Sequence, residues 1–309
     1  TLDRYDLDGL ELDFMREPFL FSVGQEAAGL PLLTAWLREL RGLVDAAAAK
    51  RGHPIRLGVR VPSMPETALG LGLDAVGWAR EGLVDLLVPT PRWATTQCDL
   101  PLERWRELLG DAPVTLAGGL EVNYRPYPAG PGSTITPDLA AGTAAMVLSR
   151  GADAVYLFNY FPGAVWPTEV YDRTLSAMAS FEALCKLPRR VAVTYREITA
   201  PGEDYHPPLP ATGATLEFML RPGRVPLRTG CEVLLGLAPS AAAAPQLEVN
   251  GRACALRSEQ SGNPELRVLV YAVPADAVAA EGDQRLVVSS ADGTALDVRR
   301  VELSLPASM

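Results

Sequence analysis

The feature that most constrains the fold is a regular alternation of short apolar strands and helical segments between Tyr5 and about Pro188. Apolar residues at three- and four-residue spacing, usually followed by Gly, mark the helical segments. The strand candidates are YDLDGLELDF (5–14), IRLGVRVPS (55–63), LVDLLVPT (83–90), PVTLAGGLEV (113–122) and DAVYLFNYF (153–161). Because such repeats pair in parallel through right-handed crossovers, this order predicts an α/β domain with a parallel sheet.

The ends of these strands distinguish between the two regular α/β architectures. An open nucleotide-binding sheet has a Gly-rich turn after its first strand, and DFMREPFLFSVG lacks one. Polar residues instead gather at the carboxyl ends of nearly every strand: Asp13 and Arg16, Arg60 and Ser63, Thr90 and Arg92, Glu121 and Asn123, Asn159 and Tyr160. A (β/α)8 TIM barrel builds its active site from this ring. The sequence therefore predicts a partial or complete barrel.

The number of strands is smaller than a closed barrel needs. Five candidates cannot close an eight-stranded ring, and TLDRYDLDG resembles the end of a helix that leads directly into a strand. We therefore expect the chain to start at the fourth strand of a barrel. An alternative is that the strand count is wrong.

After Pro188 the pattern changes to short alternating strands separated by turn residues such as NG, DG and PG. The seven candidates are VAVTYREIT, ATLEFMLR, CEVLLGLA, QLEVNG, LRVLVYAVP, QRLVVSSADG and LDVRRVELSL. This pattern is typical of a β-sandwich. We predict a barrel domain over 1–188 and an accessory sandwich over 189–309.

Composition excludes several classes of function. A formal charge of −9, a pI near 4.9 and the lack of a basic run argue against a nucleic-acid partner. No apolar run spans a membrane and no signal peptide is visible, so localisation is undetermined, with secretion or a periplasmic location open if a signal lies upstream. The scattered cysteines predict no structural metal and no cofactor, while a Cys231–Cys254 disulfide and free thiols both stay open.

The first strand carries acidic residues on its inner face. Glu11 and Asp13 share one parity, and a charge inside a barrel must be paired or must reach the open end. Arg60 has the inward parity of the next strand, so we expect it to pair with Glu11. Asp13, one step further out, then faces the mouth.

Glu121 is the natural partner of Asp13, because its strand comes three units later and lies across the barrel mouth. Two carboxyl groups on opposite sides of a substrate suit glycoside chemistry, with about 5–5.5 Å between them for retention and about 6.5–9.5 Å for inversion. Other polar and aromatic side chains at the strand ends would bind the sugar. These candidates are Glu11, Arg16, Arg60, Trp93, Asn123, Asn159, Tyr160 and Trp166.

The stretches YDLDGLELDFMREPFLF, RLGVRVPSMPETALGLGLDAVGWAREGLVDLLVPT and RGADAVYLFNYF resemble the bacterial glycosyl hydrolase-like TIM-barrel proteins, which are related to family ten-like glycosidases. The resemblance covers roughly Tyr5 to Phe161. It implies a barrel that acts on glycosides, with an acid at the end of the fourth strand that corresponds to Asp13. Analogy with the wider group places the nucleophile at Glu121. The C-terminal stretch resembles jelly-roll accessory domains.

The sequence thus predicts a hydrolase of O-glycosidic bonds, retaining rather than inverting, with Asp13 as proton donor and Glu121 as nucleophile. Many relatives carry two adjacent aspartates where this chain has Asp13 and Phe14, which keeps open a non-catalytic carbohydrate-binding protein with a degenerate barrel. A third alternative is a metal-dependent lyase, isomerase or deacetylase. The opposite parities of Asp6 and Glu11 argue against it unless Gly9 introduces a bulge. The oligomeric state is left open.

Overall fold

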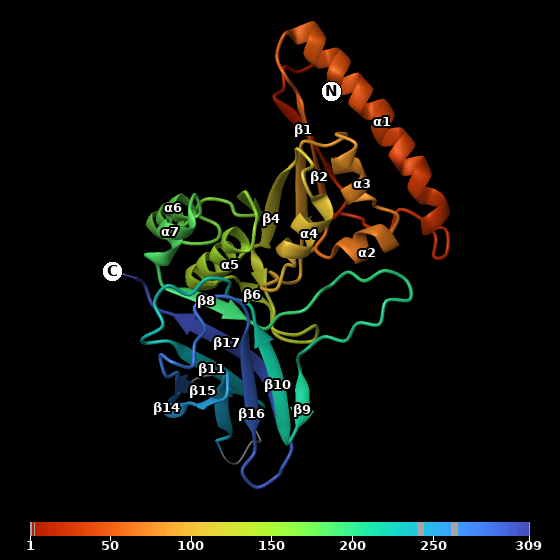
Figure 1. Cartoon of the computed structure of the whole chain (residues 1–309). Helices are drawn as coiled ribbons and strands as arrows, with labels where there is room; N and C mark the ends of the chain where they lie inside the picture. Colours follow the sequence, from red (N-terminus) through yellow and green to blue (C-terminus); the bar gives the residue numbers. More distant parts are fainter. Residues whose placement is uncertain (1, 3, 240–243, 261–264, 309) are drawn as a thin grey trace.

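The N-terminal half of the chain forms a curled parallel sheet with the strand order β1-β2-β3-β4-β7. The structure is a computed structural model, and it describes residues 2, 4–239, 244–260 and 265–308. The strands are β1 (Gly9–Asp13), β2 (Arg56–Pro62), β3 (Leu86–Thr90), β4 (Thr115–Glu121) and β7 (Ala154–Phe158). Each lies within a predicted stretch and pairs in parallel with its neighbour. These five strands form a half-barrel and not a closed ring (Figure 1).

Helices alternate with the strands, as the periodicity predicts. They are α1 (Glu26–Arg51), α2 (Pro65–Gly70), α3 (Ala75–Arg80), α4 (Leu102–Leu109), α5 (Pro137–Ser149), α6 (Thr168–Ala177) and α7 (Phe181–Cys185). Helices α2 and α3 are separated by a turn that contains Gly72, whose φ of 84° lies in the left-handed region. Asp74 then caps α3 by accepting the Gly77 N–H at 3.0 Å.

The parity of the strands separates an apolar outer face from a polar inner face. Leu57, Val59 and Val61 of β2 are fully buried in the core that also contains Trp78 of α3 and Trp105 of α4. On β4, a Cβ at Gly118 would lie 2.5 Å from Val147 of α5, so this face also meets the helices. The alternate positions of β2 and β4, which include Arg60 and Glu121, therefore face the inside of the curl.

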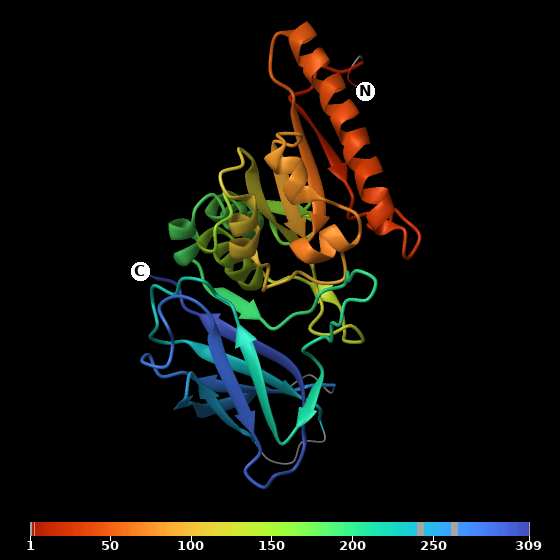
Figure 2. The same ribbon diagram turned by 45° about the vertical axis from the view of Figure 1, so that its right-hand side comes forward.

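The C-terminal half is built from antiparallel sheets (Figure 2). One sheet has the order β14-β15-β11-β17-β8, with β9 also paired to β17, and a second has the order β10-β16-β12-β13. The strands are β8 (Arg189–Ala192), β9 (Ala211–Gly213), β10 (Thr215–Leu220), β11 (Glu232–Leu237), β12 (Gln246–Val249), β13 (Arg252–Ala253), β14 (Ala255–Gln260), β15 (Arg267–Ala272), β16 (Gln284–Ser289) and β17 (Leu296–Leu305). The fold is therefore a partial barrel followed by a β domain. A small hairpin of β5 (Asn123–Tyr124) and β6 (Ser133–Thr134) projects from the barrel half.

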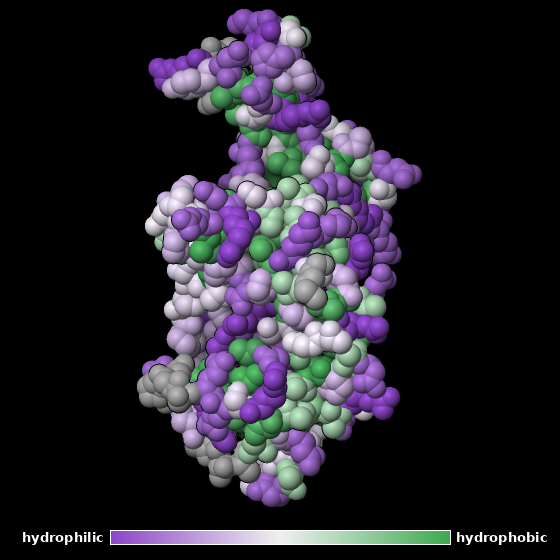
Figure 3. Space-filling model, turned by 90° about the vertical axis from the view of Figure 1, so that its left-hand side faces the viewer, coloured by the Kyte–Doolittle hydropathy of each residue, from purple (hydrophilic) through white to green (hydrophobic). Residues whose placement is uncertain are grey.

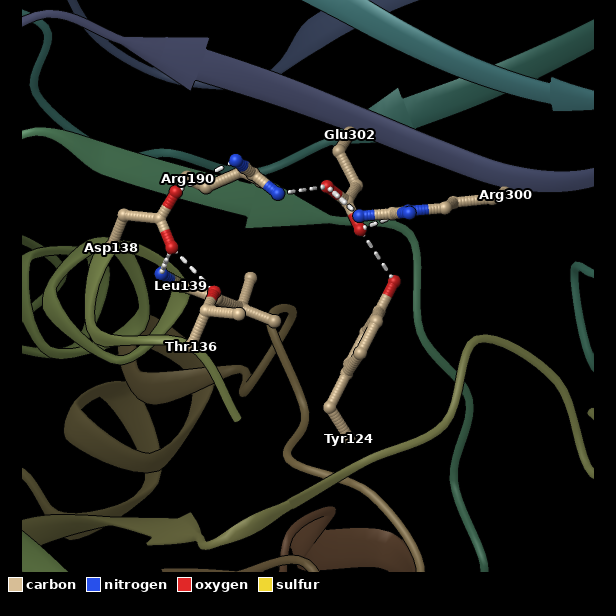
Figure 4. Close-up of polar contacts among 7 residues, drawn as sticks. All are labelled: Tyr124, Thr136, Asp138, Leu139, Arg190, Arg300 and Glu302. Carbon is tan, nitrogen blue, oxygen red and sulfur yellow. Dashed lines mark hydrogen bonds and ion pairs between the residues drawn. The ribbon is translucent and has the colours of Figure 1, made fainter. Parts of the chain in front are cut away.

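A buried charge network joins the two halves (Figure 4). Glu302 of β17 is 0% exposed and accepts hydrogen bonds from Arg300 Nε at 2.6 Å and from Arg300 Nη2 at 2.9 Å. From the barrel half, the Tyr124 hydroxyl donates to Glu302 Oε1 at 2.8 Å. Arg190 of β8 reaches Glu302 at 3.1 Å and Asp138 of α5 at 2.8 Å. Both halves thus donate hydrogen bonds to one carboxylate, and these bonds fix β17 against the hairpin and α5.

The edge of the sheet at β1 is apolar and open to solvent. A hollow of about 600 Å³ lies between β1 and α1, and its lining includes Leu10, Leu12 and Leu40. On α1, Trp36 is 45% exposed and Leu43 is 63% exposed. These two elements form the upper end of the molecule, where Figure 3 shows hydrophobic surface beneath a hydrophilic tip. Among the described helices, none has the length and apolar character that crossing a membrane requires.

Candidate active site

The inner face of the half-barrel carries a buried arginine that is paired with an aspartate. Asp13 ends β1, and its register neighbour on β2 is Arg60. Arg60 Nη1 donates to Asp13 Oδ2 at 2.7 Å, and the Arg60 side chain is only 1% exposed. The Met15 backbone N–H donates to Asp13 Oδ1 at 3.0 Å. Both oxygens of Asp13 act as acceptors, which suits the ionised carboxylate.

The predicted pairing of Arg60 with Glu11 is wrong. Glu11 accepts instead from the Tyr156 hydroxyl of β7 at 2.8 Å. Arg60 also lies over the ring of Phe158, with its Cζ 3.9 Å from the ring centroid. Register explains the difference, because Asp13 is directly opposite Arg60 whereas Glu11 is opposite Gly58. Since β1 and β7 are the outer strands of the sheet, the Tyr156–Glu11 bond also shows how far the sheet is curled.

Glu121 lies at the end of β4, with Phe158 as its register neighbour on β7. Its side chain is 0% exposed, so it does not stand open at a mouth as the sequence suggested. Oε1 accepts from the Val122 N–H at 3.0 Å, whereas Oε2 is buried and has no partner among the described residues. Burial raises the pKa of Glu121 to about 8, against the opposing effects of backbone hydrogen bonds and the Arg60 charge. Burial therefore favours the protonated form of the Glu121 carboxyl group.

Three contacts hold a short loop segment close to Glu121. The Asn123 amide nitrogen donates to the Trp93 carbonyl at 2.9 Å and lies 3.4 Å from Glu121 Oε1. Glu197 Oε2 accepts the backbone N–H groups of Trp93 at 2.8 Å and of Ala94 at 2.6 Å. The charge of Glu197 also raises the pKa of Glu121. Asn123 and Glu197 thus place residues 93–94 beside the buried carboxyl group.

Sequence reasoning missed Glu197. It lies within the predicted strand VAVTYREIT, which was assigned to the sandwich, so strand order gave no reason to bring it to the barrel. In the structure β8 ends at Ala192, and Glu197 lies in the loop that follows. The structure places it against the loop that follows β3.

Trp93 was expected to stack on a sugar, but two arginines occupy its ring. Arg16 Cζ lies 5.3 Å and Arg92 Cζ 4.9 Å from the ring centroid. The Trp93 side chain is 44% exposed. These three residues follow the carboxyl ends of β1 and β3, on the same rim as Asp13.

The remaining candidates are divided between surface and core. Asn159 is exposed after β7, with a φ of 62° that is unusual for a residue other than glycine. Tyr160 is 7% exposed, and its hydroxyl donates to the Glu121 carbonyl at 3.3 Å. Trp166 is also 7% exposed, and its Nε1–H donates to the Ile135 carbonyl at 2.9 Å. The structure places Tyr160 and Trp166 in the core and leaves Asn159 at the rim.

Metal and disulfide chemistry were also considered in the sequence. Within residues 2, 4–239, 244–260 and 265–308, no group of three His, Cys, Asp or Glu side chains is spaced to hold a metal ion. All four cysteines are free, so Cys231 and Cys254 are not joined. Burial raises the pKa of the Cys231 thiol to about 11, as expected of an unreactive buried thiol.

The two carboxyl groups differ in environment, and this difference decides what they can do. Glu121 is fully buried and burial raises its pKa, whereas Asp13 accepts from a guanidinium and a backbone N–H. Two carboxyl groups in such different environments can serve different roles in acid–base chemistry. Arg60 lies between their strands and interacts electrostatically with both.

Comparisons with known proteins give only distant likenesses. No protein-family model matches the chain, and no curated protein matches it. A GH18 chitinase structure from Chromobacterium violaceum is 11% identical, with a TM-score of 0.37, over 97% of this chain and 69% of that one. A GH86 β-porphyranase from Bacteroides plebeius is 10% identical, with a TM-score of 0.25, over 82% and 63% of the two chains. Both are glycoside hydrolases, but at these scores neither likeness carries an argument about this chain.

Proposed function

We propose that this protein hydrolyses O-glycosidic bonds in an oligo- or polysaccharide, with Glu121 as the proton donor and Asp13 as the ionised carboxylate. The observation that carries the proposal is the contrast on one inner face between a fully buried Glu121, whose Oε2 has no partner among the described residues, and a charge-paired Asp13. The roles are the reverse of those the sequence suggested. Strand position alone does not show which carboxyl group is desolvated.

The chemistry follows from these two states. Glu121 would donate its proton to the glycosidic oxygen as the C–O bond breaks, and Asp13 would attack the anomeric carbon to form a glycosyl ester. Water would then cleave this ester while Glu121 takes back a proton. Arg60 would keep the Asp13 carboxylate oriented during both steps. We keep the prediction that the anomeric configuration is retained. NMR identification of the first anomer that the reaction releases tests it.

Access to Glu121 requires a change in its surroundings, because the side chain is completely buried. The adjacent segment is residues 93–94, which Asn123 and Glu197 hold in place. A saccharide that displaces this segment would reach Oε2, the oxygen that has no partner. The proposal therefore includes a movement of residues 93–94 on binding.

The test uses Glu121→Gln and Asp13→Asn, with Glu169→Gln on the exposed face of α6 as the matched control. A panel of aryl glycosides and polysaccharides is assayed for release of the aglycone and of reducing ends. We expect each site variant to lower kcat/KM at least about 100-fold, the usual lower range for losing general acid–base catalysis, and the control to leave it unchanged. Wild-type kcat/KM should fall as the pH rises past about 8, where Glu121 loses its proton. Unchanged turnover in both site variants would overturn the assignment.

A second candidate function is carbohydrate binding without cleavage. The observation that favours it is the zero exposure of Glu121, which would suit a barrel that no longer reaches its substrate. The same panel tests it from pH 4 to 9. Saccharide binding by the wild type without release of any product would favour carbohydrate binding over hydrolysis.

A further inference from the structure

Two arginine side chains converge on one exposed indole at the rim of the half-barrel. Arg16 follows β1 and Arg92 follows β3, and both guanidinium groups lie over the Trp93 ring at 5.3 and 4.9 Å. Arg92 Nη2 also donates to the Arg16 carbonyl at 3.3 Å. Cation–π attraction and this hydrogen bond hold two like charges beside each other.

Little negative charge compensates this pair. Within the described part of the chain, no carboxylate lies within ion-pair distance of Arg16, which is exposed. Arg92 has a contact of 3.8 Å with Glu17, whose side chain is 81% exposed, and such a pair is weak in water. Arg92 Nε is buried without a hydrogen-bond partner. The rim therefore presents positive charge that no close ion pair compensates within the described part of the chain.

Trp93 has a different role from the one expected for an aromatic residue at a sugar site. A ring already in contact with two guanidinium groups is poorly placed to stack on a pyranose, but it orients the planar forks of both arginines. Arginine forks match the geometry of carboxylate and sulfate oxygens. Preorganised forks bind such a group at a lower entropic cost than free side chains would.

We propose that Arg16 and Arg92, oriented by Trp93, bind an oxyanion substituent of the glycan, either the carboxylate of a uronic acid or a sulfate ester. This inference rests on the proposed function, because it names the substrate class of that site. Asp13 lies on the same rim and Glu121 is buried at the end of β4, so a charged saccharide would be oriented with its anionic group at the two arginines and a neutral bond at the carboxyl pair.

The test measures binding in Glu121→Gln, so that turnover does not interfere. Calorimetry is carried out with an oligogalacturonide, with its methyl ester, and with a sulfated galactan oligosaccharide of matched length. We expect at least one anionic ligand to bind at least about tenfold more tightly than the neutral ester, and its affinity to fall with added salt. Preference for the galacturonide or for the sulfated ligand identifies the source of the oxyanion.

Variants then assign the effect to the rim. Arg16→Gln and Arg92→Gln should each weaken binding of the preferred anion at least about tenfold. Neither should change the affinity for the methyl ester. Arg16→Lys keeps the charge but not the fork, so it should lose part of the affinity, and Trp93→Ala should lose most of it although both arginines remain. Arg38→Gln, at an exposed arginine on α1, is the control. Thermal melts confirm that each variant is folded.

Two results would overturn the inference: equal affinity for acid and ester, or an anion affinity that survives loss of both rim arginines. Neither result affects the proposed hydrolysis, which is tested by turnover of neutral aryl glycosides. Conversely, charge-dependent binding without any turnover would support the anion site and overturn the proposal that the protein is a hydrolase.

Discussion

Two glutamates of this chain are completely buried, and they differ in almost every other respect. Glu302, between the barrel half and the β domain, accepts hydrogen bonds from Arg300, Arg190 and Tyr124. Glu121, on the inner face of the parallel sheet, accepts at Oε1 from the Val122 N–H at 3.0 Å and from the Asn123 side-chain amide at 3.4 Å, and its buried Oε2 has no partner in the described part of the chain. Burial is thus compensated at Glu302 and largely uncompensated at Glu121.

We interpret this contrast as the difference between a structural carboxylate and the proposed reactive one. A buried charge with several well-placed donors holds neighbouring elements together, and losing a partner is costly. A buried carboxyl group without such partners keeps its proton, and a pKa shifted towards neutral pH is typical of catalytic acids. The proposed hydrolysis depends on this reading of Glu121.

The largest expected effect is on the pH dependence of stability at Glu121. Its pKa rises from 4.5 to about 8 on folding, so the folded protein holds a proton that the unfolded chain loses. Below pH 4.5 both states are protonated. Between pH 4.5 and 8 the free energy of unfolding should fall by about 5 kcal/mol because of Glu121, which is about 1.4 kcal/mol per pH unit. Above pH 8 this contribution should level off.

Glu121→Gln should remove this decline. Denaturant unfolding at intervals from pH 4 to 9 measures it, and the variant should become more stable than the wild type by several kcal/mol near pH 8. The control Glu169→Gln should follow the wild-type curve. Parallel curves for Glu121→Gln and the wild type would show that Glu121 is ionised in the folded protein and would remove the basis for calling it the acid.

The second prediction concerns the network at Glu302. Glu302→Gln leaves two arginines beside a neutral amide, and breaking a buried pair costs about 3–5 kcal/mol. Because Arg190 and Arg300 are 22% and 24% exposed, we expect the lower end, about 3 kcal/mol, by urea unfolding. Glu259→Gln is the matched control, since Glu259 also makes two bonds to one arginine but on the surface of the same domain. A similar small loss for both variants would mean that burial of the network contributes little.

The sequence predicted the sheet well because parity and spacing are local properties. Five strands and their inward residues follow from alternation, and Glu11, Asp13, Arg60 and Glu121 do share the inner face. Pairing was predicted less well. Whether Arg60 meets Glu11 or Asp13 depends on a register that the alternation does not determine.

Burial was the least predictable property of the site. Glu121 and Trp166 were expected at an open mouth, yet both are buried: the loop after β3, which Glu197 holds, lies beside Glu121, and Trp166 donates to the Ile135 carbonyl. These contacts join segments up to about a hundred residues apart, and no short window of sequence contains both partners. For the same reason Glu197 was missed, and the proton donor that we propose is Glu121 instead of Asp13.

The smallest expected effect compares two tyrosine hydroxyl groups that donate to glutamates. Tyr124 donates to the buried Glu302 and Tyr156 to the exposed Glu11, both at 2.8 Å. Tyr124→Phe removes a donor that water cannot replace, so it should lower the free energy of unfolding by about 1.5 kcal/mol, the usual value for a hydrogen bond to a charged group. Tyr156→Phe should cost less, because water reaches Glu11 and supplies the missing donor. Urea unfolding of both variants measures the difference, and an equal or larger loss at Tyr156 would show that the curled inner face, and not the junction between the halves, contains the more strongly desolvated carboxylate.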